Sequence, residues 1–305
     1  MAAVAVHNLT KVYTTKKETV KAVQAVSFDV AKGELFGIIG PDGAGKTSLF
    51  RMLTTLLLPD GGSAMVDNSD IIKDFKSIRQ KVGYMPGRFS LYQDLTVEEN
   101  LNFFATIFNT SVQKNYDLIK DIYVQIEPFK NRRAGKLSGG MKQKLALSCA
   151  LIHRPVVLFL DEPTTGVDAV SRKEFWDMLQ RLKQQGITIL VSTPYMDEAA
   201  LCDRIALLQN GKILSTGTPA NIINSFANTI LAVKSEKMFQ LLRDLEGWQG
   251  VEDSYSFGEY HHAVMKKNFN EDQLRKYLEE KGHKDVRIHL TKPNIEDCFM
   301  QLMQN

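Results

Sequence analysis

Apolar and polar residues follow different patterns along the chain, and each pattern predicts a different kind of secondary-structure element. Residues 4–12 and 22–30 alternate loosely, as half-exposed strands do, which predicts an antiparallel layer at the start of the chain. Residues 156–160 and 187–191 are apolar or β-branched throughout, which is typical of a parallel sheet covered on both faces. We expect residues 82–85 to return to the antiparallel layer.

Helical spacing fills the regions between these runs. The apolar run 35–39 leads into a glycine-rich loop and then into residues 47–58, which have helical spacing. Thr96 and Glu99 have the spacing of a capping box and precede an apolar stripe. We therefore expect a mostly helical insertion over residues 91–153.

The periodicity changes again near residue 230, and with 305 residues the chain exceeds the usual size of one domain. We predict a large α/β domain over residues 1–227 and a small α+β domain over residues 228–305. The elements expected in the small domain are strands at 230–233 and 286–290, two strands that flank Gly258, and helices at 237–245, 271–281 and 294–303.

Composition bounds the class of protein. Apolar residues make up 44% of the chain and charged residues 24%, which is ordinary for a folded protein. The 38 basic and 35 acidic residues are interspersed, so we expect no nucleic-acid partner. No apolar run approaches the roughly 20 residues that span a bilayer, and no secretion signal is expected. A role at a membrane would therefore need a partner.

The cysteines and histidines favour neither disulfides nor a metal site. Cys149, Cys202 and Cys298 are odd in number and far apart, which fits a reduced, cytosolic compartment. His261 and His262 could be interpreted as metal ligands, but neighbours in a strand point to opposite faces, so shared coordination is disfavoured.

Residues 40–47 fit the phosphate-binding pattern G-x-x-x-x-G-K-[ST]. Glycines let backbone N–H groups wrap phosphates, and the following helix N-terminus adds positive charge. Lys46 would bridge the outer phosphates and Thr47 would bind magnesium. The strand before the loop and the helix after it disfavour an accidental glycine loop. The predicted nucleotide-binding residues are Gly40, Pro41, Asp42, Gly43, Ala44, Gly45, Lys46, Thr47 and Ser48.

Asp161 and Glu162 end a buried strand, at the edge where open α/β sheets hold their ligands. Asp161 would hold magnesium, and Glu162 would orient or deprotonate the attacking water. An acidic pair at a strand end is more often a solvated turn. The upstream phosphate loop is what favours the catalytic interpretation.

A third motif, Leu137-Ser138-Gly139-Gly140-Met141-Lys142-Gln143, lies between the other two. On these three motifs, in this order, residues 4–226 resemble the ATP-binding subunit of an ABC transporter. The resemblance implies a P-loop NTPase (RecA-like) core with an antiparallel β-subdomain and a helical subdomain, and head-to-tail pairing of two such domains around ATP and Mg. On its own, the motif would be interpreted as a helix cap with a glycine pair. The signature residues that would act on the partner's ATP are Leu137, Ser138, Gly139, Gly140, Met141 and Gln143.

Two further residues match the family pattern. Tyr13 stands where such proteins stack an aromatic ring on adenine, although a tyrosine near a strand end is commonly packed at a rim. Asp168 matches the D-loop at the dimer contact, and it is equally an ordinary N-cap for the next helix.

Two positions depart from the family pattern. Gly87 stands where the Q-loop glutamine is expected, and Pro194 stands where the H-loop histidine contacts the γ-phosphate. Proline lacks even a backbone N–H. Each lost transition-state contact typically costs about 10²–10³ in rate, so hydrolysis at this chain's own site should be feeble while ATP binding is retained. This asymmetry suggests pairing with a second, complete ATPase, although a homodimer that relies on Glu162 stays open.

The segment Lys292–Phe299 resembles the closing segment of drug- and antibiotic-exporter ATPases, and it also fits a capped helix docking on its own domain. The resemblance therefore favours an ABC-2-type exporter subunit, cytoplasmic and held at the inner face of the membrane by permease subunits. The alternatives are a non-transport ABC ATPase and a nucleotide-sensing regulatory subunit.

Overall fold

The computed structural model describes residues 2–15 and 18–304. The chain forms two compact units. One contains the residues up to Pro219 together with the C-terminal residues from Leu302, and the other runs from Ala220 to Gln301. The division falls at the start of α7 (Pro219–Asn224), a few residues before the boundary that the sequence predicts between residues 227 and 228. That boundary stays a prediction.

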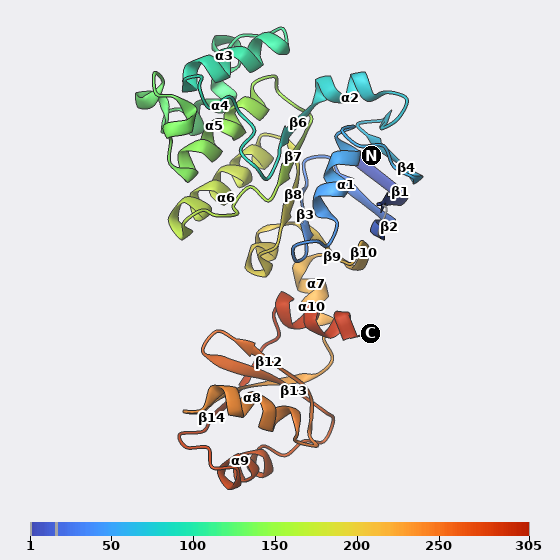
Figure 1. Ribbon diagram of the computed structural model, residues 1–305, viewed down its shortest axis with the longest axis vertical. Helices are drawn as coiled ribbons and strands as arrows, with labels where there is room; N and C mark the ends of the chain where they lie inside the picture. Colours follow the sequence, from blue (N-terminus) through green and yellow to red (C-terminus); the bar gives the residue numbers. More distant parts are fainter. Residues whose placement is uncertain (1, 16–17, 305) are drawn as a thin grey trace. The chain divides into compact units, whose positions relative to one another are not determined.

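The first unit opens with an antiparallel sheet, shown in blue in Figure 1. Val4 and Val6 of its first strand face Val30 and Phe28 of the second, and these side chains are buried in the core. The strand order is β2-β1-β4-β5, with β1 (Ala2–Thr14), β2 (Thr19–Ala31), β4 (Gly61–Val66) and β5 (Ser69–Asp70).

A six-stranded sheet forms the centre of this unit. Every residue of β3 (Leu35–Ile39), β7 (Val157–Asp161) and β8 (Thr188–Thr193) is buried, which confirms the interpretation of these apolar runs as covered parallel strands. Helix α1 (Lys46–Leu53) packs against β7, and α6 (Ala169–Gln184) packs against β3 and β8. The order is β10-β9-β3-β8-β7-β6, completed by β6 (Val82–Met85), β9 (Arg204–Gln209) and β10 (Lys212–Gly217).

Two expectations from the sequence are wrong. Strand β6 does not return to the antiparallel layer but pairs in parallel with β7. Gly83 makes this position possible, because a Cβ there would lie 2.4 Å from the carbonyl oxygen of Ala150 in the helix that packs on the strand. Helix α1 ends at Leu53 rather than near residue 58, since Thr55 adopts a left-handed conformation with φ of 62°.

The segment between β6 and β7 is mostly helical, and Figure 1 shows it in green beside the central sheet. Thr96 begins its first helix with the predicted capping box. The Thr96 hydroxyl accepts a hydrogen bond from the Glu99 N–H at 3.2 Å, and the Glu99 carboxylate accepts one from the Thr96 N–H at 2.8 Å. The helices are α3 (Val97–Ile107), α4 (Tyr116–Tyr123) and α5 (Gly139–Leu151), and α2 (Phe75–Lys81) precedes β6.

The second unit is a small α+β domain around a four-stranded antiparallel sheet of order β12-β13-β11-β14. Leu231 and Val233 of the sheet pack with Leu241 and Leu274 of two helices. Its elements are β11 (Thr229–Lys234), β12 (Val251–Phe257), β13 (Tyr260–Met265), β14 (Arg287–Thr291), α8 (Met238–Glu246), α9 (Glu271–Glu280) and α10 (Ile295–Gln304).

His261 and His262 are buried and engaged in separate hydrogen bonds. His261 Nε2 lies 2.7 Å from the Met238 carbonyl oxygen, and His262 Nδ1 lies 2.7 Å from Asp297 Oδ1. Within residues 2–15 and 18–304, no group of three or more His, Cys, Asp or Glu side chains is placed to bind a metal ion.

The three cysteines are buried free thiols. Among the described residues, no helix combines the length and the apolar character that a membrane crossing requires.

The capping box predicts the effect of Thr96→Ala. Removing the hydroxyl leaves an N–H at the start of α3 without its acceptor, so the free energy of unfolding should fall by about 1 kcal/mol, measured by urea denaturation. Thr106→Ala is the matched control, because the Thr106 hydroxyl only bonds back to the Asn102 carbonyl within the same helix. Equal losses in the two variants would contradict a capping role for Thr96.

Candidate nucleotide-binding site

Parallel strand pairing brings the predicted motifs to one edge of the central sheet. Ile39 at the end of β3 pairs with Thr193 at the end of β8, and Ser192 pairs with Asp161 at the end of β7. The segments that follow these three strands therefore leave the sheet side by side. They are the glycine-rich loop, the acidic pair and the segment that begins with Pro194.

The glycine-rich loop has a shape that only glycine permits at two positions. A Cβ at Gly40 would lie 2.1 Å from the Leu208 carbonyl oxygen, and one at Gly45 would lie 2.1 Å from that of Ala22. Gly45 also has a φ of 107°, which L side chains rarely adopt. Asp42 and Gly43 are exposed at the tip of the loop, and α1 begins at Lys46. The backbone thus offers a concave loop at a helix N-terminus, which suits phosphate groups.

Lys46 lies at the centre of the site and is only 3% exposed. Its ammonium group donates to the carbonyl oxygens of Gly40, at 2.8 Å, and Pro41, at 3.0 Å. It also forms an ion pair with Glu162 Oε1 at 2.9 Å. Because a buried cation needs compensating charge, phosphate oxygens that approach Lys46 would compete with Glu162 for it.

Asp161 is buried at the end of β7 and accepts a hydrogen bond from the Ser192 hydroxyl at 2.7 Å. Burial raises the pKa of this carboxyl, and hydrogen bonds from Ser192 and Thr47 oppose the shift. The oxygen atoms of Thr47 and Asp161 fit magnesium, which takes few protein ligands and prefers oxygen. Bound there, magnesium would neutralise negative charge on the phosphates.

Glu162 follows Asp161 in a left-handed conformation, with φ of 51°. Its N–H donates to the carbonyl oxygen and the hydroxyl oxygen of Ser192, at 3.0 and 3.1 Å. The Glu162 side chain is 22% exposed, so water can reach it. A carboxylate held this way is placed to act as a general base once it leaves Lys46.

The signature segment forms the start of α5, and its polar end is exposed to solvent. Ser138 and Gly139 are exposed, Leu137 is buried beneath them, and the Ser138 hydroxyl accepts a hydrogen bond from the Met141 N–H at 3.4 Å. A Cβ at Gly140 would lie 2.9 Å from Ser171 Oγ, so this glycine allows α5 to approach α6 closely.

The same contact involves Asp168, which caps α6 by accepting a hydrogen bond from the Ser171 N–H at 3.0 Å. The predicted N-cap is therefore present. The D-loop role of Asp168 at a dimer contact stays a prediction.

Gly87 and Pro194, the two positions predicted to depart from the family pattern, also lie at this edge. A Cβ at Gly87 would lie 2.9 Å from the Asp161 carbonyl oxygen. Gly87 and Glu162 line a cavity of about 160 Å³, together with Lys142 and Gln143 of α5. Pro194 follows β8 directly and offers neither a side-chain donor nor an N–H.

Tyr13 lies near the start of α1. The residue is 39% exposed, and its hydroxyl lies 3.1 Å from Ser48 Oγ. The Lys11 ammonium lies 5.7 Å from the ring centroid. An exposed face is thus available for stacking, and the Ser48 contact fixes the position of the ring.

Sequence reasoning missed the roles of Ser192 and Glu198. Ser192 contacts both Asp161 and Glu162, whereas Glu198 is a buried carboxylate that accepts hydrogen bonds from Thr164 and Thr193. Ser192 could have been found, because a polar residue at the end of an apolar parallel strand meets the ends of its neighbours. No sequence pattern indicates the position of Glu198.

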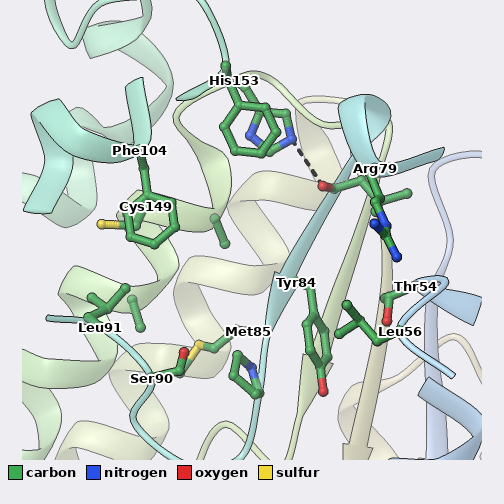
Figure 2. Close-up of a pocket in the computed structure, with 15 residues that line it drawn as sticks. Thr54, Leu56, Arg79, Tyr84, Met85, Ser90, Leu91, Phe104, Cys149 and His153 are labelled. Carbon is green, nitrogen blue, oxygen red and sulfur yellow. Dashed lines mark hydrogen bonds between the residues drawn. The ribbon is translucent and has the colours of Figure 1, made fainter. Parts of the chain in front are cut away.

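A second hollow, the subdomain groove, lies between β6 and the helical segment and has a volume of about 200 Å³. Figure 2 shows Tyr84 and Leu56 on its sheet side and Phe104 and Cys149 on its helical side. Burial raises the pKa of Tyr84 to about 12. The groove and the cavity beside Gly87 share four lining residues, which are Met85, Pro86, Ser90 and Ala146.

His153 closes one end of the subdomain groove. Its Nε2 lies 3.0 Å from the Val82 carbonyl oxygen, a hydrogen bond drawn as a dashed line in Figure 2. Its ring stacks on Phe108 with 3.7 Å between centroids. Burial lowers the pKa of His153. Because the Val82 carbonyl oxygen can only accept, Nε2 carries a proton. Nδ1 is buried and has no hydrogen-bond partner among the residues that the structure describes.

Comparisons with known proteins agree with these features. A family model described as ABC transporter matches residues 23–165, which include the phosphate loop, the signature segment and the acidic pair. The chain is 35% identical over 287 residues to the Nod factor export ATP-binding protein I of Rhizobium sp. (strain N33), covering 92% of this chain and 91% of that protein.

A longer relative and a solved structure agree. The probable multidrug ABC transporter ATP-binding protein YbhF of Escherichia coli (strain K12) is 39% identical over 286 residues, which cover 92% of this chain. The chain spans about half of that relative's length, 49%. The dimeric post-hydrolysis state of the ATP-binding cassette MJ0796, bound to ADP and Pi, superposes with a TM-score of 0.64 at 26% identity. The superposed residues cover 70% of this chain and 98% of the MJ0796 chain.

The family model covers the phosphate loop and the acidic pair, and the Rhizobium relative matches this chain over nine-tenths of both lengths. This chain therefore belongs to the family of ABC transporter ATP-binding proteins, whose cassettes hydrolyse ATP.

Proposed function

We propose that this chain is the ATP-binding and ATP-hydrolysing subunit of an ABC-2-type membrane exporter, with an impaired site of its own and a second ATPase as its partner. The observation that carries the proposal is the contrast at one sheet edge. Lys46, Thr47, Asp161 and Glu162 lie together as candidates for binding and hydrolysing ATP, whereas Gly87 and Pro194 offer no polar side chain to the reaction. The names of the relatives, which describe multidrug and Nod factor export, support the exporter assignment.

In the proposed mechanism, the loop N–H groups and Lys46 bind the phosphates, and Thr47 and Asp161 hold magnesium. Displacement of Glu162 from Lys46 frees its carboxylate to take a proton from the attacking water. Two transition-state contacts are missing, and each loss typically costs about 10²–10³ in rate. ATP is therefore bound well and hydrolysed slowly, and slow hydrolysis prolongs the closed, ATP-bound pair.

Tyr13 would stack on adenine, and Asp168 would contact the partner subunit. The exposed Ser138 and Gly139 support the proposal that the signature serves the partner's ATP, because that surface is free to meet another molecule. A heterodimer then contains one complete site, formed by the partner's catalytic groups and this chain's signature. A homodimer would contain two weakened sites.

The permease subunits would dock at the subdomain groove. Apolar walls suit a short helix of a membrane protein, and His153 Nδ1 offers an acceptor for a hydrogen-bond donor of that helix. Since Met85, Pro86, Ser90 and Ala146 also line the cavity beside Gly87 and Glu162, movement of a docked helix would reach the ATP site directly. Selectivity for the exported substrate would lie in the permease.

A nucleotide-sensing regulatory subunit is the second candidate. Gly87 and Pro194 favour it, and the retained Glu162 beside Lys46 disfavours it.

The first test compares the purified chain with Glu162→Gln. We expect tight Mg-ATP binding in both, with negligible turnover that the substitution lowers less than about tenfold, because the own site already lacks two contacts. Binding is measured with a fluorescent ATP analogue and turnover by phosphate release. Robust turnover that Glu162→Gln abolishes would instead favour a homodimer in which Gly87 and Pro194 are tolerated.

A second test concerns position 87. Gly87→Gln should not restore turnover, because its Cβ would lie 2.9 Å from the Asp161 carbonyl oxygen and the backbone must shift. Such overpacking costs about 1–3 kcal/mol, which thermal unfolding would detect in both Gly87→Gln and Gly87→Ala. Gly61→Ala is the control, since the nearest atom to its Cβ is Thr10 Cβ at 3.7 Å. A gain in turnover without loss of stability would contradict this interpretation.

A third test concerns the subdomain groove. Leu56 is 56% exposed and lines the groove, and Leu58 is 66% exposed and lies outside it. Leu56→Glu should reduce recovery of the chain with membranes of its native cells, because a buried charge opposes docking. Leu58→Glu should leave recovery unchanged, and both variants should bind ATP normally. Equal recovery of the two variants would place permease docking elsewhere.

A further inference from the structure

A buried carboxylate lies beneath the catalytic edge and has no part in the mechanism described so far. Glu198 is 1% exposed. Its Oε1 accepts a hydrogen bond from the Thr164 hydroxyl at 2.8 Å, and its Oε2 accepts one from the Thr193 hydroxyl at 2.5 Å. Burying a carboxylate is costly unless donors satisfy it, so this arrangement depends on both threonines.

The two donors belong to different segments of the site. Thr164 lies two residues after Glu162 in the loop that leaves β7, and Thr193 ends β8 directly before Pro194. The Thr193 hydroxyl also accepts a hydrogen bond from the Tyr195 N–H at 3.1 Å. A single carboxylate therefore joins the loop that carries the general base to the segment that lacks its histidine.

A third segment reaches the same carboxylate from α6. Arg172 Nε lies 3.8 Å from Glu198 Oε1, and the guanidinium carbon lies 4.1 Å from the centroid of the Tyr195 ring. Arg172 lies one turn after Asp168, and its N–H bonds the Asp168 carbonyl oxygen at 2.9 Å. Asp197 is the other charged group nearby, with Oδ2 at 3.9 Å from Arg172 Nη1.

The backbone at Glu162 gives this cluster a role. A glutamate with φ of 51° is in a conformation that costs energy and persists only where its surroundings hold it. Ser192 holds the Glu162 N–H from the β8 side. On the other side of Glu162, Thr164 is held by Glu198, so Glu198 limits how far the carboxylate of Glu162 can move.

We infer that Glu198 is a positioning residue for ATP hydrolysis, which fixes the loop of Glu162 against the end of β8 through Thr164 and Thr193. The inference rests on the proposed role of Glu162 as general base. With Gly87 and Pro194 contributing no polar side chain, the part of the remaining rate that depends on Glu162 depends on how that carboxylate is held.

The test measures the rate of single-turnover hydrolysis with the chain in excess over Mg-ATP. ATP affinity and the midpoint of thermal unfolding are measured on the same variants. Glu198→Ala should lower the single-turnover rate severalfold and by no more than Glu162→Gln does, because Glu198 acts only through the position of Glu162, while ATP affinity stays within about threefold. Glu198→Gln should recover part of the rate, since the amide oxygen still accepts one hydroxyl and the amide N–H₂ can donate to the other.

Two further variants separate positioning from stability. Thr164→Val keeps the side-chain shape and removes one hydrogen-bond donor to Glu198, so it should lower the single-turnover rate by less than Glu198→Ala does and leave ATP affinity unchanged. It replaces Glu198→Ala in the test if that variant does not fold. Asp297→Asn is the matched control, because Asp297 is a fully buried carboxylate of the second unit that accepts hydrogen bonds from Tyr255 and His262, both at 2.7 Å. It should lower the unfolding midpoint and leave the rate per folded molecule unchanged.

Unchanged rates in folded Glu198→Gln and Thr164→Val would overturn the inference, as would a loss of affinity that accounts for the whole effect. A wild-type rate indistinguishable from that of Glu162→Gln would overturn the inference about Glu198 but not the proposed function, since an exporter subunit whose own site does not hydrolyse ATP remains compatible with that proposal. Rapid turnover that depends on Glu162 would instead contradict the impaired site, and Glu198→Ala would still be expected to lower that rate.

Discussion

The parallel pairing of β3, β8 and β7 is the constraint on which the site depends. Its register sets Ile39 beside Thr193 and Ser192 beside Asp161, so three segments distant in sequence leave the sheet at one edge. Side chains alternate along a strand, and a slip of one residue would turn Asp161 away from Ser192 and Thr47. The continuous apolar sequence of these strands fixes the register only together with α1, α6 and the antiparallel sheet, which cover them.

Within that frame, the charge of Lys46 would connect ATP binding with catalysis in the proposed mechanism. A buried ammonium group needs an anion nearby, and the Glu162 carboxylate provides it in this structure. Phosphate groups would take over this role, and the same exchange would release the Glu162 carboxylate. ATP binding and activation of the base would then be two results of one ion-pair exchange.

The sequence predicts the parts of this structure that depend on local chemistry. The apolar runs of β3, β7 and β8 and the capping box at Thr96 follow from pattern alone, since each is recognisable within a few residues. The sheet that β6 joins could not be predicted, because four residues with a glycine fit either sheet and only the approach of α5 decides. Glu198 was equally hidden, since its two threonine partners come from different strand ends.

Gly87 is a position where the fold itself requires a small residue. The space that a side chain would enter is taken by the carbonyl oxygen of Asp161, so the loop lies against the end of β7. This loop also lines the subdomain groove, and its path there fixes the wall that a permease helix would meet. The exposed signature residues Ser138 and Gly139 belong to a separate helix start. In the proposed asymmetric pair, the approach of Gly87 to Asp161 would weaken this chain's own site, while the separate surface at Ser138 and Gly139 would still serve a partner's ATP.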